Sequence, residues 1–197
     1  MRTGTRLLRS RRVWLVGGLI LTAGAAHAAS IERLHVDHEH EAYRVTARVH
    51  IAAPAGPAYA AAIDFERLPD YSAMIESTRL IGADKLASRM RLCVLWYCKT
   101  LRQVMRYRLD PPKRIDMTVV PGRGDLSSGN AHWRFKPDGE HATELEFRAR
   151  IVPDLWVPPL IGPWAIARAL REQVVATATA IERLAQHRDD ANDKPTP

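Results

Sequence analysis

The fold is decided by one short stretch of the sequence, YRVTARVHI at residues 43–51. Apolar side chains alternate in it with arginine, threonine and histidine, which is the period of two that a half-buried β-strand produces. A strand of this kind belongs to an antiparallel sheet whose other face meets water. The stretch therefore predicts a sheet with one dry face and one polar face.

The same alternation recurs further along the chain. Residues 31–40 give a first, less regular strand before the clean one at 43–52, and turn residues separate the later strands. These later strands are expected at 77–84, 87–94, 98–109, 114–120, 126–136 and 143–152. Alternate residues of each strand share a face of the sheet, and this parity places only Gln103, Tyr107 and Tyr43 as polar groups on the inner face. The sequence therefore predicts a wide, dry surface there.

Helices are expected at two places. Pro54 and Pro57 favour a short helix at about 58–65, and a second short piece is expected to run through Ile75. An apolar stripe at spacings of three and four predicts a long helix over 164–186. The order of one strand, two short helices, six strands and one long helix indicates an α+β fold with a sheet of about seven strands.

Residues 1–28 have the pattern of a cleaved secretory signal. A basic segment precedes an apolar stretch from about Val13 to Ala25, and AHA at 26–28 matches a small-x-small cleavage site. The apolar stretch is short and rich in Gly and Ala for a bilayer span, although an uncleaved anchor is the alternative. We therefore expect a mature chain that starts at Ala29 in the periplasm.

The charge of the chain also depends on this leader. The net charge is +7, but residues 1–28 hold five arginines and no acid, so the remainder carries +2. The Arg11–Arg12 pair leaves a twin-arginine export route open beside general secretion. An exported protein rarely meets nucleic acid, so we expect no nucleic-acid partner. We expect one domain over 29–186 and a disordered polar tail over 187–197.

Three segments carry a resemblance to a known family. They are DFERLPDY at 64–71, the stretch from Gly129 to Trp133, and IVP at 151–153 leading to VPPLIGP at 157–163. With the order of elements they resemble the START-like superfamily, also called SRPBCC, polyketide cyclase/dehydrase and lipid transport, or Bet v 1-like. In particular the chain looks like its exported bacterial branch. The resemblance covers roughly residues 31–186 and implies a helix-grip fold, in which a curved antiparallel sheet wraps around a long C-terminal helix.

Cys93 and Cys98 are the only cysteines of the chain. Parity places both on the outward face of one hairpin, where opposed Cα atoms can lie about 4.5 Å apart, within the range of a disulfide. We expect a structural disulfide. Two free thiols are the alternative, and a redox dithiol is disfavoured because a thioredoxin-like motif has two intervening residues rather than four.

The hairpin between the cysteines has an apolar tip, VLWY at residues 94–97. Its side chains could pack over the edge of the sheet. The alternative is a gate or a membrane contact, for which we select Tyr71, Leu95, Trp96 and Tyr97. Five arginines on the outer face of the hairpin would then meet anionic headgroups, or they form a solvated face: Arg89, Arg91, Arg102, Arg106 and Arg108.

The dry inner face predicts an elongated apolar cavity between the sheet and the long helix. The expected lining consists of inward residues of six strands and one stripe of the helix: Val45, Val49, Met90, Leu92, Leu101, Gln103, Met105, Tyr107, Met117, Trp133, Phe147, Ile166, Leu170 and Val174. The alternative is a filled core, with Trp133, Phe135 and Phe147 occupying the space.

These features predict a periplasmic binding or carrier protein for a hydrophobic small molecule or lipid. We expect neither covalent chemistry nor a cofactor. The alternative is a cyclase/dehydrase-type enzyme, which would need a titratable pair in the cavity, such as an inward His132 or Asp116. A further alternative is an envelope interaction protein with a filled core and an exposed patch at Trp96 and Tyr97.

The expected partners follow from the same reasoning. A hydrophobic ligand comes first, and the hairpin is the expected site of any transient contact with a membrane surface. Two cysteines that pair within the chain leave none for a disulfide-linked dimer, so we expect a monomer. His35, His38 and His40 could bring two imidazoles to one face, but no third metal ligand is evident, so we expect no metal site.

Overall fold

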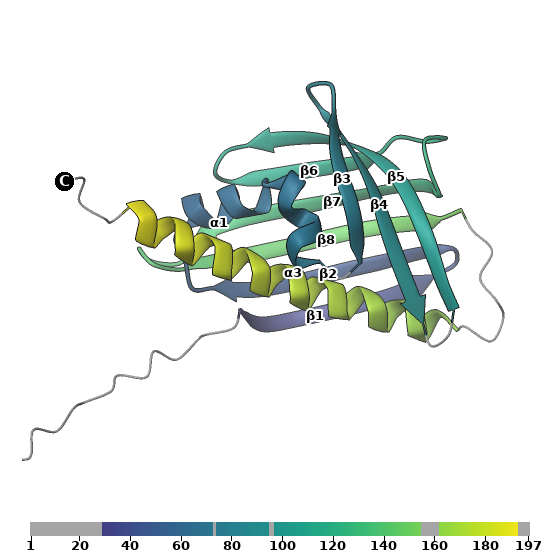
Figure 1. Cartoon of the computed structure of the whole chain (residues 1–197). Helices are drawn as coiled ribbons and strands as arrows, with labels where there is room; N and C mark the ends of the chain where they lie inside the picture. The colour runs from purple at the N-terminus through teal and green to yellow at the C-terminus, as the bar shows by residue number, and fades with distance from the viewer. Residues whose placement is uncertain (1–28, 73, 95–96, 155–161, 193–197) are drawn as a thin grey trace, which may run out of the picture.

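The computed structural model describes residues 29–72, 74–94, 97–154 and 162–192. Within them it has eight strands and four helical segments (Figure 1). The strands are β1 (Ser30–Glu39), β2 (Ala42–Ile51), β3 (Ile75–Ile81), β4 (Lys85–Val94), β5 (Tyr97–Asp110), β6 (Arg114–Val119), β7 (Leu126–Pro137) and β8 (Thr143–Pro153). The helices are α1 (Ala55–Ala62), the 3₁₀ turn η1 (Phe65–Arg67), α2 (Leu68–Tyr71) and α3 (Pro163–Asn192).

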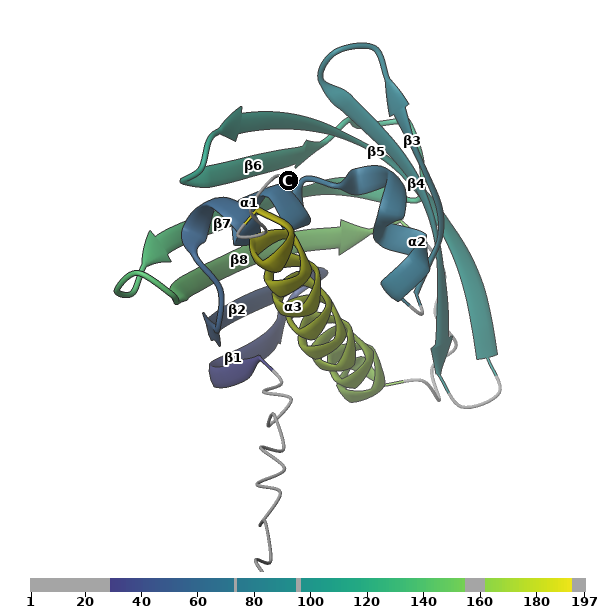
Figure 2. The same cartoon turned by 60° about the vertical axis from the view of Figure 1, so that its left-hand side comes forward.

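All eight strands belong to one antiparallel sheet with the order β1-β2-β8-β7-β6-β5-β4-β3. The sheet curves around α3, which lies along its concave face, while α1 covers one end and α2 lies against β3 (Figure 2). The chain therefore has the expected helix-grip α+β fold.

The expected number of strands was one too low, because β1 is a full strand of the sheet. It pairs with β2 from Ser30 opposite His50 to Glu39 opposite Ala42. A bulge between Ile31 and Arg33 interrupts its alternation, and most of its side chains are exposed. An edge strand with a bulge shows a weak period of two, which explains its irregular pattern in the sequence.

The expected parity of the strands is confirmed. In β2 the side chains of Val45, Val49 and Ile51 are buried, and those of Arg44 and Arg48 are exposed. The register carries this division across the sheet, because residues directly opposite each other share a face. The inner face is therefore apolar along most of its length.

The long helix extends further than its apolar stripe suggested. It ends at Asn192, so the polar segment from His187 begins inside the helix instead of in a disordered tail. Tertiary contacts explain the extra turns, since an Arg188 guanidinium nitrogen lies 2.5 Å from a carboxylate oxygen of Asp64. Residues 193–197 lie outside the described residues.

The corner between β2 and α1 fastens the second half of α3 to the sheet. Glu182 accepts a hydrogen bond from the backbone N–H of Ala52 at 2.7 Å, and Gln186 donates one to the Ala52 carbonyl at 3.0 Å. Thr143 donates to the neighbouring carbonyl of Ala53 at 2.7 Å. The second carboxylate oxygen of Glu182 is buried without a hydrogen-bond partner among the described residues.

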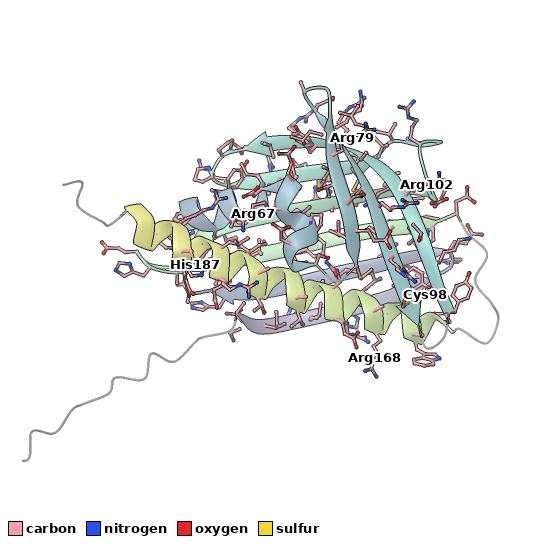
Figure 3. All side chains as sticks on the ribbon, in the orientation of Figure 1. Arg67, Arg79, Cys98, Arg102, Arg168 and His187 are labelled. Carbon is pink, nitrogen blue, oxygen red and sulfur yellow. A yellow bond between two sulfur atoms is a disulfide. The ribbon has the colours of Figure 1, made fainter. Side chains whose placement is uncertain are left out.

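The disulfide is confirmed. Cys93 and Cys98 oppose each other on β4 and β5 with their Cα atoms 4.0 Å apart, and their sulfur atoms are bonded. Both residues are exposed on the outer face. Figure 3 shows Cys98 at the end of the hairpin, beside the first turns of α3. The disulfide therefore ties the two strands where the hairpin approaches the helix.

Candidate ligand cavity

A cavity lies between the inner face of the sheet and α3, in two adjoining parts. The outer chamber has a volume of about 1030 Å³ and the inner chamber about 240 Å³. Inner-face and helix residues form the wall common to both: Met90, Gln103, Met105, Ala131, Phe147, Gln173 and Val174. The helix contacts mainly β1, β2 and β4, and the strands between β2 and β4 in the curved sheet stay further from it (Figure 2). The space lies between those strands and α3.

Most of the residues expected to line a cavity do line one of these chambers. The outer chamber contains Val45, Met90, Leu92, Leu101, Gln103, Met105, Phe147, Ile166, Leu170 and Val174. The inner chamber contains Val49, Met117 and Trp133 besides the shared residues. The period of two on the strands and the apolar stripe on the helix together placed these side chains correctly.

Tyr107 was the exception among the expected lining residues. It lies on the inward parity of β5 but borders neither chamber. Its hydroxyl donates to the backbone carbonyl of Ala83 at 3.1 Å, and its ring lies 5.2 Å from that of Phe65. The 3₁₀ turn that follows α1 covers this part of the sheet, so Tyr107 belongs to the packed end of the core.

The aromatic side chains fill only part of the interior. Trp133 and Phe147 contact each other with ring centroids 4.5 Å apart, and both border the inner chamber. Phe135 is buried against Tyr59 instead, with ring centroids 5.5 Å apart in an edge-on arrangement. The filled core that we considered as an alternative therefore describes the end under α1, and the chambers remain open beyond it.

Two glutamine side chains supply the polar groups on the shared wall. Gln173 of α3 donates from its amide nitrogen to Ser72 at 2.8 Å and to Thr177 at 3.0 Å. Its carbonyl oxygen has no hydrogen-bond partner among the described residues. Gln103 faces it from the sheet side of the cavity and makes only a long contact of 3.7 Å with the sulfur of Met90.

Gln173 was not among the expected residues, although a signal for it existed. It lies three residues after Leu170 and four before Thr177, so it borders the apolar stripe of the helix. The apolar criterion excluded it because it is polar. A search for single polar residues at stripe positions would have found it.

Histidine, lysine and acidic side chains line the outer chamber only where it meets solvent. All of them are exposed, and we call this set the rim: His38, His40, Glu41, Lys99 and Asp154. They come from the β1–β2 turn, the start of β5 and the end of β8, which lie at the same end of the sheet (Figure 1). Lys99 was overlooked, although it shares its parity with Leu101 and Gln103.

Tyr43 adds a hydroxyl to the outer chamber. Burial raises the pKa of Tyr43 above its usual value, so the phenol remains neutral at physiological pH. Its ring lies 4.5 Å from the imidazole of His38. A neutral hydroxyl can orient a ligand but has little capacity for acid–base work near neutral pH.

The expected gate is described only in part. Tyr97 borders the outer chamber and packs with Leu92 near Ala165, at the start of α3. Leu95 and Trp96 lie outside the described residues, as does the side chain of Tyr71. The gate and the exposed Trp96–Tyr97 patch therefore stay predictions.

The arginines on the hairpin are mostly in ion pairs. Arg89 and Arg91 both lie within 3.8 Å of Glu76, and Arg106 lies 2.9 Å from Asp84. The nearest carboxylate oxygen of Asp125 lies 4.0 Å from the guanidinium of Arg102. These partners neutralise most of the charge that a membrane contact at the hairpin would use.

The residues considered for the enzyme alternative, His132 and Asp116, do not face the cavity. His132 and Asp116 contact each other at 2.7 Å between Nδ1 and a carboxylate oxygen, but on the outer face of the sheet. Their side chains are 53% and 29% exposed.

The described residues contain no group of three or more His, Cys, Asp or Glu side chains arranged to hold a metal ion. Among them, no helix is long and apolar enough to cross a membrane.

The sequence and the fold both match known proteins. The sequence profile of a family described as "Polyketide cyclase / dehydrase and lipid transport" matches residues 42–185. No curated protein sequence is significantly similar to this chain.

Several solved structures share the fold. A START superfamily protein from Mycobacterium smegmatis has a TM-score of 0.59 at 18% identity, and the match covers 73% of this chain and 97% of that one. A conserved protein from Geobacillus kaustophilus has a TM-score of 0.60 at 12% identity, covering 73% and 95%. The Zhui aromatase/cyclase from Streptomyces sp. R1128 has a TM-score of 0.52 at 16% identity, covering 78% and 96%. At these identities the likeness establishes the fold alone.

Proposed function

The chain belongs to the polyketide cyclase/dehydrase and lipid transport family of the START-like superfamily, and we propose that it is a periplasmic carrier that binds a hydrophobic small molecule or lipid. One observation carries the proposal, namely the outer chamber of about 1030 Å³ with a predominantly apolar wall. Chambers of roughly 300–1,000 Å³ with such walls bury most of the surface of a small ligand. The ionisable groups stay at the rim, so a buried ligand meets no charge.

The shared wall suggests which ligand fits. An apolar chain or ring system would occupy the space between α3 and the sheet, and a hydroxyl or carbonyl group would lie near Gln103 and Gln173. The free carbonyl oxygen of Gln173 can accept a hydrogen bond, and the amide of Gln103 can donate one. A ligand with one such group is favoured over a pure hydrocarbon, because unpaired buried amides cost free energy.

Location and assembly complete the proposal. The leader-like residues 1–28 and the disulfide between Cys93 and Cys98 suit an exported protein, since disulfides persist in oxidising compartments. We propose a monomer that releases its ligand during transient contact with a membrane surface. Cyclase-type chemistry is the second candidate of the family, and it would have to use the rim, because His132 and Asp116 face outward.

Native mass spectrometry of the protein purified from its own envelope tests the carrier function. A hydrophobic passenger in a one-to-one complex, released by organic extraction, is the expected result and would identify the class of ligand. A bare protein mass that persists after incubation with an extract of envelope lipids would contradict it.

A further inference from the structure

The outer face of β2, β8, β7 and β6 carries a strong excess of positive charge. Its outward side chains include seven basic and three acidic residues, an excess of four: Arg44, Arg48, Arg114, Arg134, Lys136, Arg148 and Arg150 against Asp116, Glu144 and Glu146. Residues 29–197 as a whole have an excess of only two, because five of the 29 basic residues lie in residues 1–28 and 22 acidic residues oppose the rest. The remainder of this span therefore has a net charge of −2. We call the seven basic residues and their surroundings the arginine face.

The register brings like charges together on this face. Arg44 lies directly opposite Arg150 on β2 and β8, and Arg114 lies directly opposite Arg134 on β6 and β7. Like charges at opposed positions of a sheet destabilise it. Glu146 opposes Arg134 on the β8 side, and the hairpin likewise opposes Arg89 to Arg102. The charge excess of the whole face, and not a single opposed pair, therefore points to an anionic partner.

The acidic residues of the face are already engaged. Glu146 lies 2.6 Å from Lys136 and 3.4 Å from Arg48, and the Lys136 hydrogen bond is the main reason that the pKa of Glu146 is lowered. Asp116 lies 3.4 Å from Arg114 and 2.7 Å from His132.

Three arginines on the face have no ion-pair partner among the described residues: Arg134, Arg148 and Arg150. Arg134 and Arg148 border a hollow of about 180 Å³, together with Arg114, His132, Trp133 and two acidic residues, Asp116 and Glu146. Both acids are already paired with basic residues of the face. At about 30 Å³ for each water molecule, the hollow has room for a hydrated phosphate group. The guanidinium fork matches the oxygens of a phosphate in geometry and charge.

The composition of the face decides between a bilayer and a protein as partner. The exposed large apolar side chains among the described residues are Leu80, Trp164 and Val175, which lie on β3 and α3. A protein interface usually has a core of aromatic and apolar anchors, and the arginine face offers none. A lipid surface with anionic headgroups needs no such anchors, since each nearby basic residue contributes by electrostatic attraction alone.

We propose that the arginine face docks on the surface of an anionic lipid bilayer, with Arg134, Arg148 and Arg150 contacting headgroup phosphates. The cavity lies between α3 and the other face of the sheet, the face on which Figure 2 shows α3, so its rim stays open while the protein is docked. The inference does not depend on which ligand, if any, fills the chambers.

The test compares two triple variants of the same charge. In the first, Arg134, Arg148 and Arg150 are each replaced by Gln. In the matched control, Arg89, Arg102 and Arg106 of the hairpin are replaced by Gln, which removes three arginines that have acidic partners. Both are made in residues 29–197, which contain every described strand and helix and exclude the basic leader. Circular dichroism and thermal unfolding confirm that each variant is folded.

Sedimentation with phosphatidylcholine vesicles, with and without phosphatidylglycerol, measures binding. The parent chain is expected to bind the anionic vesicles at about 0.01 M salt and to be released near 1 M, where the Debye length falls to about 3 Å. The first triple should weaken binding on the order of a hundredfold, since each basic residue near an anionic surface contributes about fivefold. The control triple should lose much less of its affinity for the anionic vesicles.

Three results would overturn the proposal. The first is an absence of binding to anionic vesicles at low salt, and the second is equal binding to neutral vesicles. The third is a control triple whose affinity for anionic vesicles falls as much as that of the first triple or more. That result would place the contact on the hairpin, or show that binding depends only on the net charge of the protein. Ligand occupancy by native mass spectrometry should be unchanged in both variants, so the carrier function is tested separately.

Discussion

The two ends of the cavity are built on the same sheet but differ in how they are covered. At the closed end α1 lies between α3 and β7, and the second half of α3 lies against β2 (left in Figure 1). The side chains of Ile51, Ala58, Ala61 and Ala185 are fully buried there. At the open end the described residues that cover the inner face belong to the first half of α3, where Ala165 packs against Leu92 and Tyr97. The exposed rim surrounds the outer chamber there. An apolar inner face therefore becomes core or cavity according to what covers it.

The largest expected effect on stability comes from the same substitution, isoleucine to alanine, made at the closed end and at the open end of the cavity. Ile51→Ala should lower the free energy of unfolding by about 2–5 kcal/mol, because it opens a hole in a packed region. Ile166→Ala should cost clearly less, since that side chain already borders the outer chamber. Urea unfolding measures both, and equal losses would show that the open end is packed as tightly as the closed end.

The corner at Ala52 gives the next test of the closed end. Glu182→Leu should cost about 1–3 kcal/mol, because it leaves the backbone N–H of Ala52 buried without an acceptor. Glu182→Gln keeps an acceptor oxygen in place and should cost less. Chemical denaturation of both variants is the measurement. A Leu variant as stable as the parent would mean that water or another group satisfies the N–H.

At the open end the disulfide has a smaller expected contribution. Replacing both Cys93 and Cys98 by Ser should cost at most about 2 kcal/mol, because the closed loop is short. Amide hydrogen exchange should increase along the ends of β4 and β5 and remain unchanged at α1. A uniform increase over the whole sheet would contradict a local role.

The smallest change in stability, but a clear change in binding, is expected from Val174→Trp. Val174 borders both chambers, so the larger ring should reduce the affinity for an apolar fluorescent probe at least about tenfold, or about 1.4 kcal/mol. Val175→Trp is the control, since Val175 is 42% exposed on the same helix. Equal affinity in both variants would place the binding site elsewhere.

Much of the molecule could be predicted from local patterns. The period of two identified which side chains of β2 and β5 face inward, and the same parity placed Cys93 opposite Cys98. Helix spacing placed Ile166, Leu170 and Val174 on the cavity side of α3. These inferences succeeded because backbone geometry alone fixes the direction of a side chain in a strand or helix.

The failures share a different cause. Tyr107 has the correct parity, but η1 covers it with Phe65, and no local pattern reports a segment that is distant in sequence. The helix continues past Gln186 because Arg188 forms an ion pair with Asp64, a residue distant in sequence. The pattern of β1 was weak because a bulge interrupts an exposed edge strand.

The sequence by itself determined the alternating faces of the sheet, the long amphipathic helix and the disulfide, because each depends on neighbours along the chain or on a single hairpin. Only the tertiary structure decided that the inner face encloses chambers instead of a solid core, since empty volume depends on how distant elements meet. It also decided which arginines remain without partners. On the hairpin, Arg89, Arg91, Arg102 and Arg106 pair with Glu76, Asp84 or Asp125. Arg134, Arg148 and Arg150 of the arginine face lie within ion-pair distance of no acid among the described residues.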